Sequence, residues 1–298
     1  MEKTLMFSFP IIDTHVHLWD STYLHRPWLE EVPLLNRPYG LKQYLEQTAG
    51  LPIEAIVCVE ADVLPEERLQ EVRWLSEQAR QTPLIQGIVA AAPIGVEDRT
   101  ALRSFLERLV TIDPRVKGVR RIIQGEMMPG FCVQPDFVHD IQVLSEYDLS
   151  FDLCLTHRQL PDVIELVRLC PGTRFVLDHI GKPDIRQHLL DPWREHIQEL
   201  ATFPNVDCKI SGMVTEADHQ HWTVEDIAPY VMHVLTAFGE DRVMFGGDWP
   251  VLLLASSYQR WIETVDMLTA HKPSSAMRKF WSENARRIYR LNNTYSLT

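Results

Sequence analysis

Short runs of apolar residues alternate along the chain with longer segments in which apolar residues recur at helical spacing. The short runs are rich in β-branched and aromatic residues, and several are almost continuously apolar, which is typical of parallel strands covered on both faces. They predict strands at 11–17, 53–60, 84–93, 116–124, 149–157, 174–181, 205–212 and 242–250. The longer segments predict helices at 65–80, 134–148, 160–172, 222–239, 256–271 and 274–291.

This order of elements predicts one α/β domain, a (β/α)8 TIM barrel over residues 1–298. A doubly wound open sheet is the alternative, but the first strand is not followed by the glycine fingerprint of a nucleotide-binding fold. The connection at 18–39 contains three prolines and has no clear period. We expect it to form a long loop that lies over the barrel mouth and acts as a lid.

Charge and composition restrict the classes of partner. The 298 residues include 29 basic and 41 acidic side chains, a formal net charge of −12 that disfavours nucleic acid and anionic membranes. No apolar run is long enough to cross a bilayer, and the first residues do not resemble a targeting signal. Five cysteines without a CxxC pair indicate a reduced, cytoplasmic protein. A homo-oligomer is compatible with these features.

Polar side chains occupy the predicted carboxyl ends of the strands, where the catalytic residues of barrel enzymes lie. They are His15 and His17 on the first strand, Arg120 to Gln124 on the fourth, His157 on the fifth, His179 on the sixth, Lys209 on the seventh and Asp248 on the eighth. Each could have a purely structural role when taken alone; Asp248, for example, could cap the next helix. Their occurrence at the same end of successive strands instead predicts one shared cavity.

The order of these residues resembles that of the amidohydrolase superfamily, which has HxH on the first strand, histidines on the fifth and sixth, and aspartate on the eighth. The sequence is most similar to the amidohydrolase-2 family, in the group of sugar-lactone hydrolases such as the L-fuconolactonase and L-rhamnonolactonase types. The matching stretches are IDTHVHLWD, KGVRRIIQGE, FDLCLTHRQLPDV, FVLDHIGKP, NVDCKISGMVTEAD and RVMFGGDWPV. They extend from residue 12 to about residue 251, and ASSYQRW continues the similarity to residue 261.

The resemblance implies hydrolysis of a sugar-acid lactone or of a related carboxylated lactone. Asp248 is then the expected general base, which takes a proton from water and passes it to the leaving alkoxide. His179 and His157 would polarise the carbonyl or orient the substrate, and Arg120 would supply positive charge near the oxyanion or a substrate carboxylate. A metal-dependent decarboxylase of the same superfamily is one alternative, and a binding protein without catalysis is another.

Four further residues are candidates for substrate binding. Gln124 shares a strand face with Arg120 because side chains alternate along a strand. Trp28 and Trp249 could each place a ring against the C–H face of a sugar, although tryptophan is mostly a packing residue. Lys209 is either a ligand group or a buried lysine with a partner.

His15, His17 and Asp248, together with His157 if it lies close enough, have the side chains that bind one Zn²⁺ or Mn²⁺. Two-metal members of the superfamily carry a bridging lysine or glutamate on the fourth strand, whereas this chain has Arg120, which cannot coordinate a cation. One divalent metal is therefore favoured, and catalysis without a metal is the alternative. Asp13 is expected to brace one of the histidines.

Overall fold

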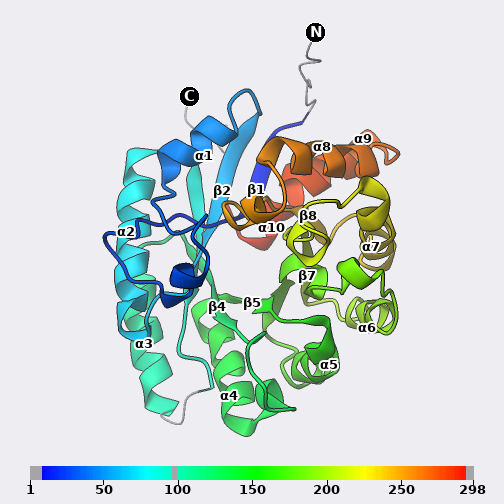
Figure 1. Ribbon diagram of the computed structural model, residues 1–298. Coiled ribbons are helices and arrows are strands. Elements are labelled where there is room, and N and C mark those ends of the chain that lie inside the picture. The colour runs from blue at the N-terminus through cyan, green and yellow to red at the C-terminus, as the bar shows by residue number, and fades with distance from the viewer. Residues whose placement is uncertain (1–8, 96–98, 293–298) are drawn as a thin grey trace.

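The computed structural model describes residues 9–95 and 99–292, in which eight parallel strands form a barrel with helices around it (Figure 1). The strands are β1 (Ile11–Val16), β2 (Ile53–Val59), β3 (Ile85–Ala91), β4 (Val116–Ile122), β5 (Ser150–Cys154), β6 (Arg174–Leu177), β7 (Val206–Ile210) and β8 (Val243–Phe245). Each strand pairs with the next in chain order. The amide of Asp248 donates to the His15 carbonyl and that of His17 to the Trp249 carbonyl, each at 2.7 Å, and these bonds join β1 to the segment after β8. The predicted barrel is confirmed.

The helices lie outside the strands (Figure 1). They are α1 (Leu41–Gln47), α2 (Arg68–Gln81), α3 (Arg99–Ile112), α4 (Pro135–Val143), α5 (Leu160–Leu169), α6 (Trp193–Leu200), α7 (Val224–Ala237), α8 (Tyr258–Thr269), α9 (Ser274–Arg278) and α10 (Asn284–Ile288). Proline at the start of α4 and α5 fits a position where no backbone N–H is needed. The helices α1, α3 and α6 lie outside the predicted helical segments, and a π-helical turn over Lys279–Glu283 interrupts the predicted helix at 274–291.

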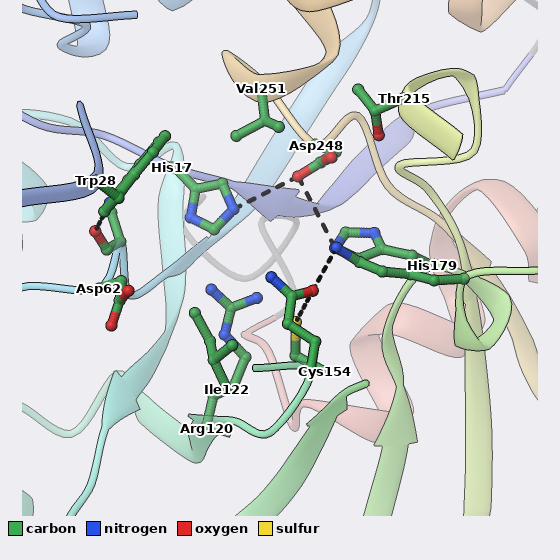
Figure 2. Close-up of a pocket in the computed structure, with 13 residues that line it drawn as sticks. His17, Trp28, Asp62, Arg120, Ile122, Cys154, His179, Thr215, Asp248 and Val251 are labelled. Atoms are coloured by element: carbon green, nitrogen blue, oxygen red, sulfur yellow. Dashed lines mark hydrogen bonds and ion pairs between the residues drawn. The ribbon is translucent and has the colours of Figure 1, made fainter. Parts of the chain in front are cut away.

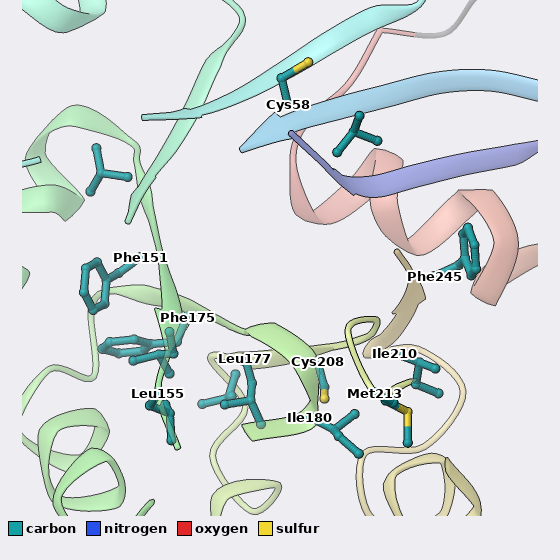
Figure 3. Packing of buried hydrophobic residues seen from close by; sticks show 14 of the residues in the cluster. Cys58, Phe151, Leu155, Phe175, Leu177, Ile180, Cys208, Ile210, Met213 and Phe245 are labelled. Atoms are coloured by element: carbon teal, nitrogen blue, oxygen red, sulfur yellow. The ribbon is translucent and has the colours of Figure 1, made fainter. Parts of the chain in front are cut away.

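Two layers of buried apolar side chains hold the barrel together. The outer layer lies between strands and helices and includes Phe151, Phe175 and Leu177 from neighbouring strands (Figure 3). The inner layer lies within the barrel and consists of Ile12, Ala55, Val57, Val59, Val89, Val176 and Met244 with Ala285, Ile288, Tyr289 and Leu291. The last four belong to the C-terminal segment, in which Asn284 donates to the Val243 carbonyl at the start of β8. This segment therefore closes the end of the barrel opposite the carboxyl ends of the strands.

The first strand departs from regular alternation because its pairing with β2 shifts register between Asp13 and Val16. As a result, the Asp13 carboxylate accepts hydrogen bonds from the hydroxyls of Tyr44 on α1 at 3.1 Å and Tyr258 on α8 at 2.8 Å. His15 points into the barrel, towards Lys209 on β7. Regular alternation would place Asp13 and His15 on one face, but the two side chains point to different sides of the strand, and the expectation that Asp13 braces one of the histidines is wrong.

The connection at 18–39 packs as an ordered loop against the barrel. Trp19 and Tyr39 form two backbone hydrogen bonds of 2.9 Å, and the 3-10 helix η1 (Pro27–Glu31) lies between them in the chain. The Trp28 indole donates to the carbonyl of Ala61 after β2 at 3.0 Å. This hydrogen bond fixes one side of the loop to the segment that follows β2. That the loop acts as a lid remains a prediction.

Cys58, Cys132, Cys154, Cys170 and Cys208 are all buried, and none of them forms a disulfide in the structure. Residues 9–95 and 99–292 contain no helix with the length and apolar character that crossing a bilayer requires.

Candidate active site

A cavity of about 240 Å³ lies at the carboxyl ends of the strands (Figure 2). Its walls are formed by His17, Trp28, Ala61, Asp62, Arg120, Ile122, Gln124, Cys154, His179, Lys182, Thr215, Asp248 and Val251. His17 follows β1, Arg120 lies on β4, His179 follows β6 and Asp248 follows β8. The structure thus brings together side chains that are separated by more than two hundred positions in sequence, as their placement at strand ends predicts.

Three imidazole nitrogens surround one carboxylate oxygen in this cavity. Asp248 Oδ1 lies 3.5 Å from Nε2 of His17, 3.7 Å from Nε2 of His15 and 4.0 Å from Nε2 of His179. The Nε2 atoms of His15 and His17 are themselves 3.2 Å apart. Zn²⁺ binds such nitrogen and oxygen atoms at about 2.0–2.2 Å. The ligand atoms of His15, His179 and Asp248 all lie within 4.8 Å of one another, and His17 Nε2 lies beside two of them.

The other ring nitrogen of each histidine faces a protein group. The Nδ1 atoms lie 3.0 Å from the Val59 carbonyl oxygen for His17, 2.9 Å from Ser211 Oγ for His179 and 3.3 Å from Asp178 Oδ1 for His15. A carbonyl only accepts hydrogen bonds, so the neutral ring of His17 carries its proton on Nδ1. Its Nε2 lone pair is then free towards Asp248, which is the arrangement found where histidine binds a metal.

Burial sets the charges of this group. It lowers the pKa of His179 to about 4 despite the attraction of Asp248, and it lowers the pKa of His15 well below its ordinary value. Burial opposes ionisation of Asp248, but its interactions with His179 and His17 outweigh burial and lower the pKa of that carboxyl. At neutral pH His15 and His179 are therefore neutral and Asp248 is ionised, a donor set suited to Zn²⁺ or Mn²⁺.

The backbone at two of these residues adopts the left-handed region, which is uncommon for side chains other than glycine. The φ angles are 54° at His179 and 56° at Asp248. Gly212 lies against His179, and a Cβ atom at this glycine would overlap the imidazole ring. Strained backbone of this kind persists where the surroundings hold it, and it is concentrated at functional sites.

Arg120 lines the cavity with its charge already balanced. Its Nε donates to Glu60 Oε1 at 2.5 Å, Nη2 to the Glu60 carbonyl at 2.9 Å and Nη1 to Asp178 Oδ2 at 3.1 Å. Nη1 also lies 3.3 Å from Nε2 of His15. Of the five N–H groups of a guanidinium, this leaves one on Nη2 for a ligand.

Lys209 does not line the cavity. The side chain is fully buried, and its Nζ lies 2.7 Å from Asp152 Oδ2 and 3.0 Å from Asp178 Oδ1. The Tyr289 hydroxyl donates to the same Asp152 oxygen at 2.6 Å. Of the two interpretations from the sequence, the position of Lys209 fits a buried lysine with partners, because its ammonium lies beneath the cavity and not on its wall.

Two further candidates also lie outside the cavity. Strand β5 ends at Cys154 and the chain then turns, so His157 faces a neighbouring pocket and Cys154 occupies the expected position. Trp249 is fully buried, with its ring packed edge-on against Tyr39 and Tyr44 at 5.4 Å between centroids. The geometry gives neither His157 nor Trp249 direct contact with a molecule in this cavity.

Trp28 and Gln124 do line the cavity, as expected. Gln124 Oε1 accepts a hydrogen bond from Lys182 Nζ at 2.7 Å. Sequence reasoning missed Asp62, Cys154 and Lys182 as lining residues. Lys182 follows His179 in the HIGKP stretch, which could have indicated it, whereas Asp62 lies beyond an apolar strand without any motif.

Comparison with known proteins gives four findings. A family model described as Amidohydrolase matches residues 12–291. A protein named L-fucono-1,5-lactonase from Burkholderia multivorans is 31% identical over 296 residues, 94% of this chain and 96% of that protein. A protein named L-rhamnono-gamma-lactonase from Scheffersomyces stipitis is 23% identical over 346 residues, 96% of this chain and 100% of that protein. Among solved structures, an amidohydrolase from Burkholderia multivorans with bound zinc has a TM-score of 0.84 at 30% identity, covering 95% of this chain and 100% of that chain.

Proposed function

This chain belongs to the amidohydrolase family, and we propose on that premise that it is a hydrolase that opens a sugar-acid lactone in the cavity at the carboxyl ends of its strands. The observation that carries the proposal is the group of His15, His17, His179 and Asp248, whose ligand atoms face one another in that cavity. Similarity to proteins named as lactonases supports an ester rather than an amide as the bond that is hydrolysed.

We further propose that this group holds one divalent metal, Zn²⁺ or Mn²⁺. The Nε2 atoms of His15, His17 and His179 and the carboxylate of Asp248 would be its ligands. Such an ion, when bound, polarises the carbonyl and lowers the pKa of a coordinated water towards about 7. The neutral imidazoles, the ionised carboxylate and the engaged Nδ1 atoms support this assignment.

In the reaction, the oxygen of water bonds to the lactone carbonyl carbon and the ring C–O bond breaks. Asp248 would take the proton that water loses and transfer it to the leaving alkoxide oxygen. Oδ1 faces the imidazoles, which leaves Oδ2 for this proton. Lys182 and Arg120 lie on the cavity wall and would stabilise the developing oxyanion, and Gln124 would orient the substrate.

One observation favours the metal-free alternative. Arg120 Nη1 lies 3.3 Å from the Nε2 atom of His15 and can donate a hydrogen to it. In the metal-free mechanism the guanidinium of Arg120 takes up the lone pair of His15 Nε2 that a metal would need. Asp248 would then activate a water that is not bound to a metal. The two versions share Asp248 as the base and differ in whether activity survives removal of metal. No contact in the cavity specifically favours the decarboxylase alternative.

The experiment is an assay of acid release on a panel of aldono-1,4- and aldono-1,5-lactones, with CO₂ release from aromatic acids measured in parallel. We expect acid release by the parent and a fall in kcat/KM of about 10²–10⁴-fold in Asp248→Asn. Glu77→Gln, an exposed carboxylate on α2, is the matched control and should match the parent. Release of CO₂ without lactone hydrolysis, or full activity in Asp248→Asn, would contradict the proposal.

A further inference from the structure

The segment after β2 forms one wall of the cavity, which we call the β2 wall: Glu60, Ala61 and Asp62 with Trp28 from the preceding loop. The Trp28 indole donates to the Ala61 carbonyl at 3.0 Å, and the Asp62 amide donates to Glu60 Oε2 at 2.7 Å. The other Glu60 oxygen binds Arg120. Asp62 has a φ of 53°, so these bonds hold it in an uncommon backbone conformation. These hydrogen bonds therefore fix the positions of the residues in the β2 wall.

Trp28 and Asp62 lie next to each other on the side of the cavity away from His179 (Figure 2). Trp28 is half-buried and Asp62 is exposed, so both can meet a bound molecule. An indole face packs against C–H groups. A carboxylate only accepts hydrogen bonds, and those it accepts are about twice as strong as bonds between neutral groups. Together the two side chains suit a ring that carries hydroxyl groups.

The charges on the cavity wall also favour a neutral ring that carries hydroxyl groups. Glu60 and Asp178 balance the guanidinium of Arg120, and the Lys182 ammonium lies 3.7 Å from a Glu216 oxygen. In residues 9–95 and 101–292 no cationic nitrogen lies within 4.0 Å of the Asp62 carboxylate. Arg120 and Arg68 attract this carboxylate only from farther away, so Asp62 has no ion-pair partner on this wall and disfavours an anionic substituent on the substrate.

We propose that Asp62 and Trp28 determine substrate specificity: adjacent hydroxyls of a neutral lactone ring donate to the Asp62 carboxylate while the ring packs on the Trp28 indole. This inference rests on the proposed lactone hydrolysis and decides between the two substrate classes that the sequence leaves open. A hydroxylated lactone gains charge-assisted hydrogen bonds at this wall, whereas a lactone that bears a carboxylate is repelled by Asp62.

The test compares three lactones: a hydroxylated aldono-1,5-lactone, unsubstituted δ-valerolactone and a lactone bearing a carboxylate. The parent should have its highest kcat/KM on the hydroxylated compound. Asp62→Asn should lower the ratio of kcat/KM for the hydroxylated lactone to that for δ-valerolactone by about 10- to 100-fold, the value of hydrogen bonds to a charged group. The same variant should gain on the carboxylated lactone relative to δ-valerolactone, because the repulsion is removed.

Glu77→Gln removes an exposed carboxylate outside the cavity and should leave both ratios unchanged. If Asp62→Asn keeps the ratios of the parent, or if the carboxylated lactone is the best substrate of the parent, the assignment of Asp62 is wrong although lactone hydrolysis stands. If the parent hydrolyses none of the three lactones, the proposed hydrolysis itself fails, and the assignment fails with it.

Discussion

Replacing Lys209 by methionine tests whether the ions beneath the cavity support the fold. The ammonium is fully buried and lies within 3.0 Å of two carboxylates, those of Asp152 and Asp178. Methionine has a similar length and carries no charge. The variant therefore leaves both carboxylates buried and takes away their shared cation.

The expected loss of stability can be worked out from the distances between the Lys209 ammonium and the two carboxylates. With an effective dielectric constant of about 20, ion pairs at 2.7 and 3.0 Å correspond to attractions of about 6 and 5.5 kcal/mol. The cost of removing the three charges from water offsets much of this attraction, and loss of one partner from a buried pair typically costs about 3–5 kcal/mol. We expect Lys209→Met to lower the free energy of unfolding by that amount, and Tm by about 10 °C.

Urea unfolding followed by circular dichroism, with calorimetry for Tm, measures this loss. Lys42→Met is the matched control, because Lys42 is 83% exposed and its pair with Glu46 is 4.0 Å long, so that its removal should cost less than about 1 kcal/mol. In Lys209→Met/Asp152→Asn, one of the two carboxylates is also neutralised, and part of the loss should be recovered. Equal stability of Lys209→Met and Lys42→Met would refute the reasoning.

Two further predictions concern the metal and the pH dependence. Protein prepared with Zn²⁺ or Mn²⁺ should contain about one equivalent per chain by elemental analysis and less in His17→Asn, and chelation should abolish lactone hydrolysis; full activity after chelation would favour the metal-free alternative. Burial raises the pKa of Asp207 to about 6 against the attraction of Arg287. The folded protein therefore binds more protons than the unfolded chain between pH 3.8 and about 6, and its free energy of unfolding falls as pH rises through that window. Asp207→Asn should thus be more stable than the parent at pH 7.5 by about 1–3 kcal/mol in urea unfolding, and a variant that is less stable would contradict this.

The strands could be predicted because short apolar runs that recur at regular intervals, with helical segments between them, are typical of a parallel barrel in a chain of this length. The expected meeting of His17, His179 and Asp248 depends only on the end of the strand at which each lies, and it tolerates errors of one or two residues. Asp13 was misplaced because a register shift within β1 changes which face a side chain occupies, and alternation alone contains no signal for it.

His157 and Asp62 show the limit of this reasoning. The fifth apolar run continues past Cys154, but the backbone leaves the strand there, so the histidine three residues later points elsewhere. Asp62 becomes part of the cavity through a local hydrogen bond to Glu60 and through the contact of Trp28 with Ala61, which joins segments far apart in the chain. The pairing of Lys209 with two aspartates from other strands is likewise a property of the packed barrel.

The C-terminal segment bears on how the protein is made. Tyr289 reaches Asp152 in the middle of the barrel, and Ile288 and Leu291 fill its lower end. A ribosome releases these residues after all eight strands have been synthesised. Until then the side chains that cover the base of the barrel and the hydroxyl that binds Asp152 are missing, so the eight strands alone should be less stable than the domain that includes this segment.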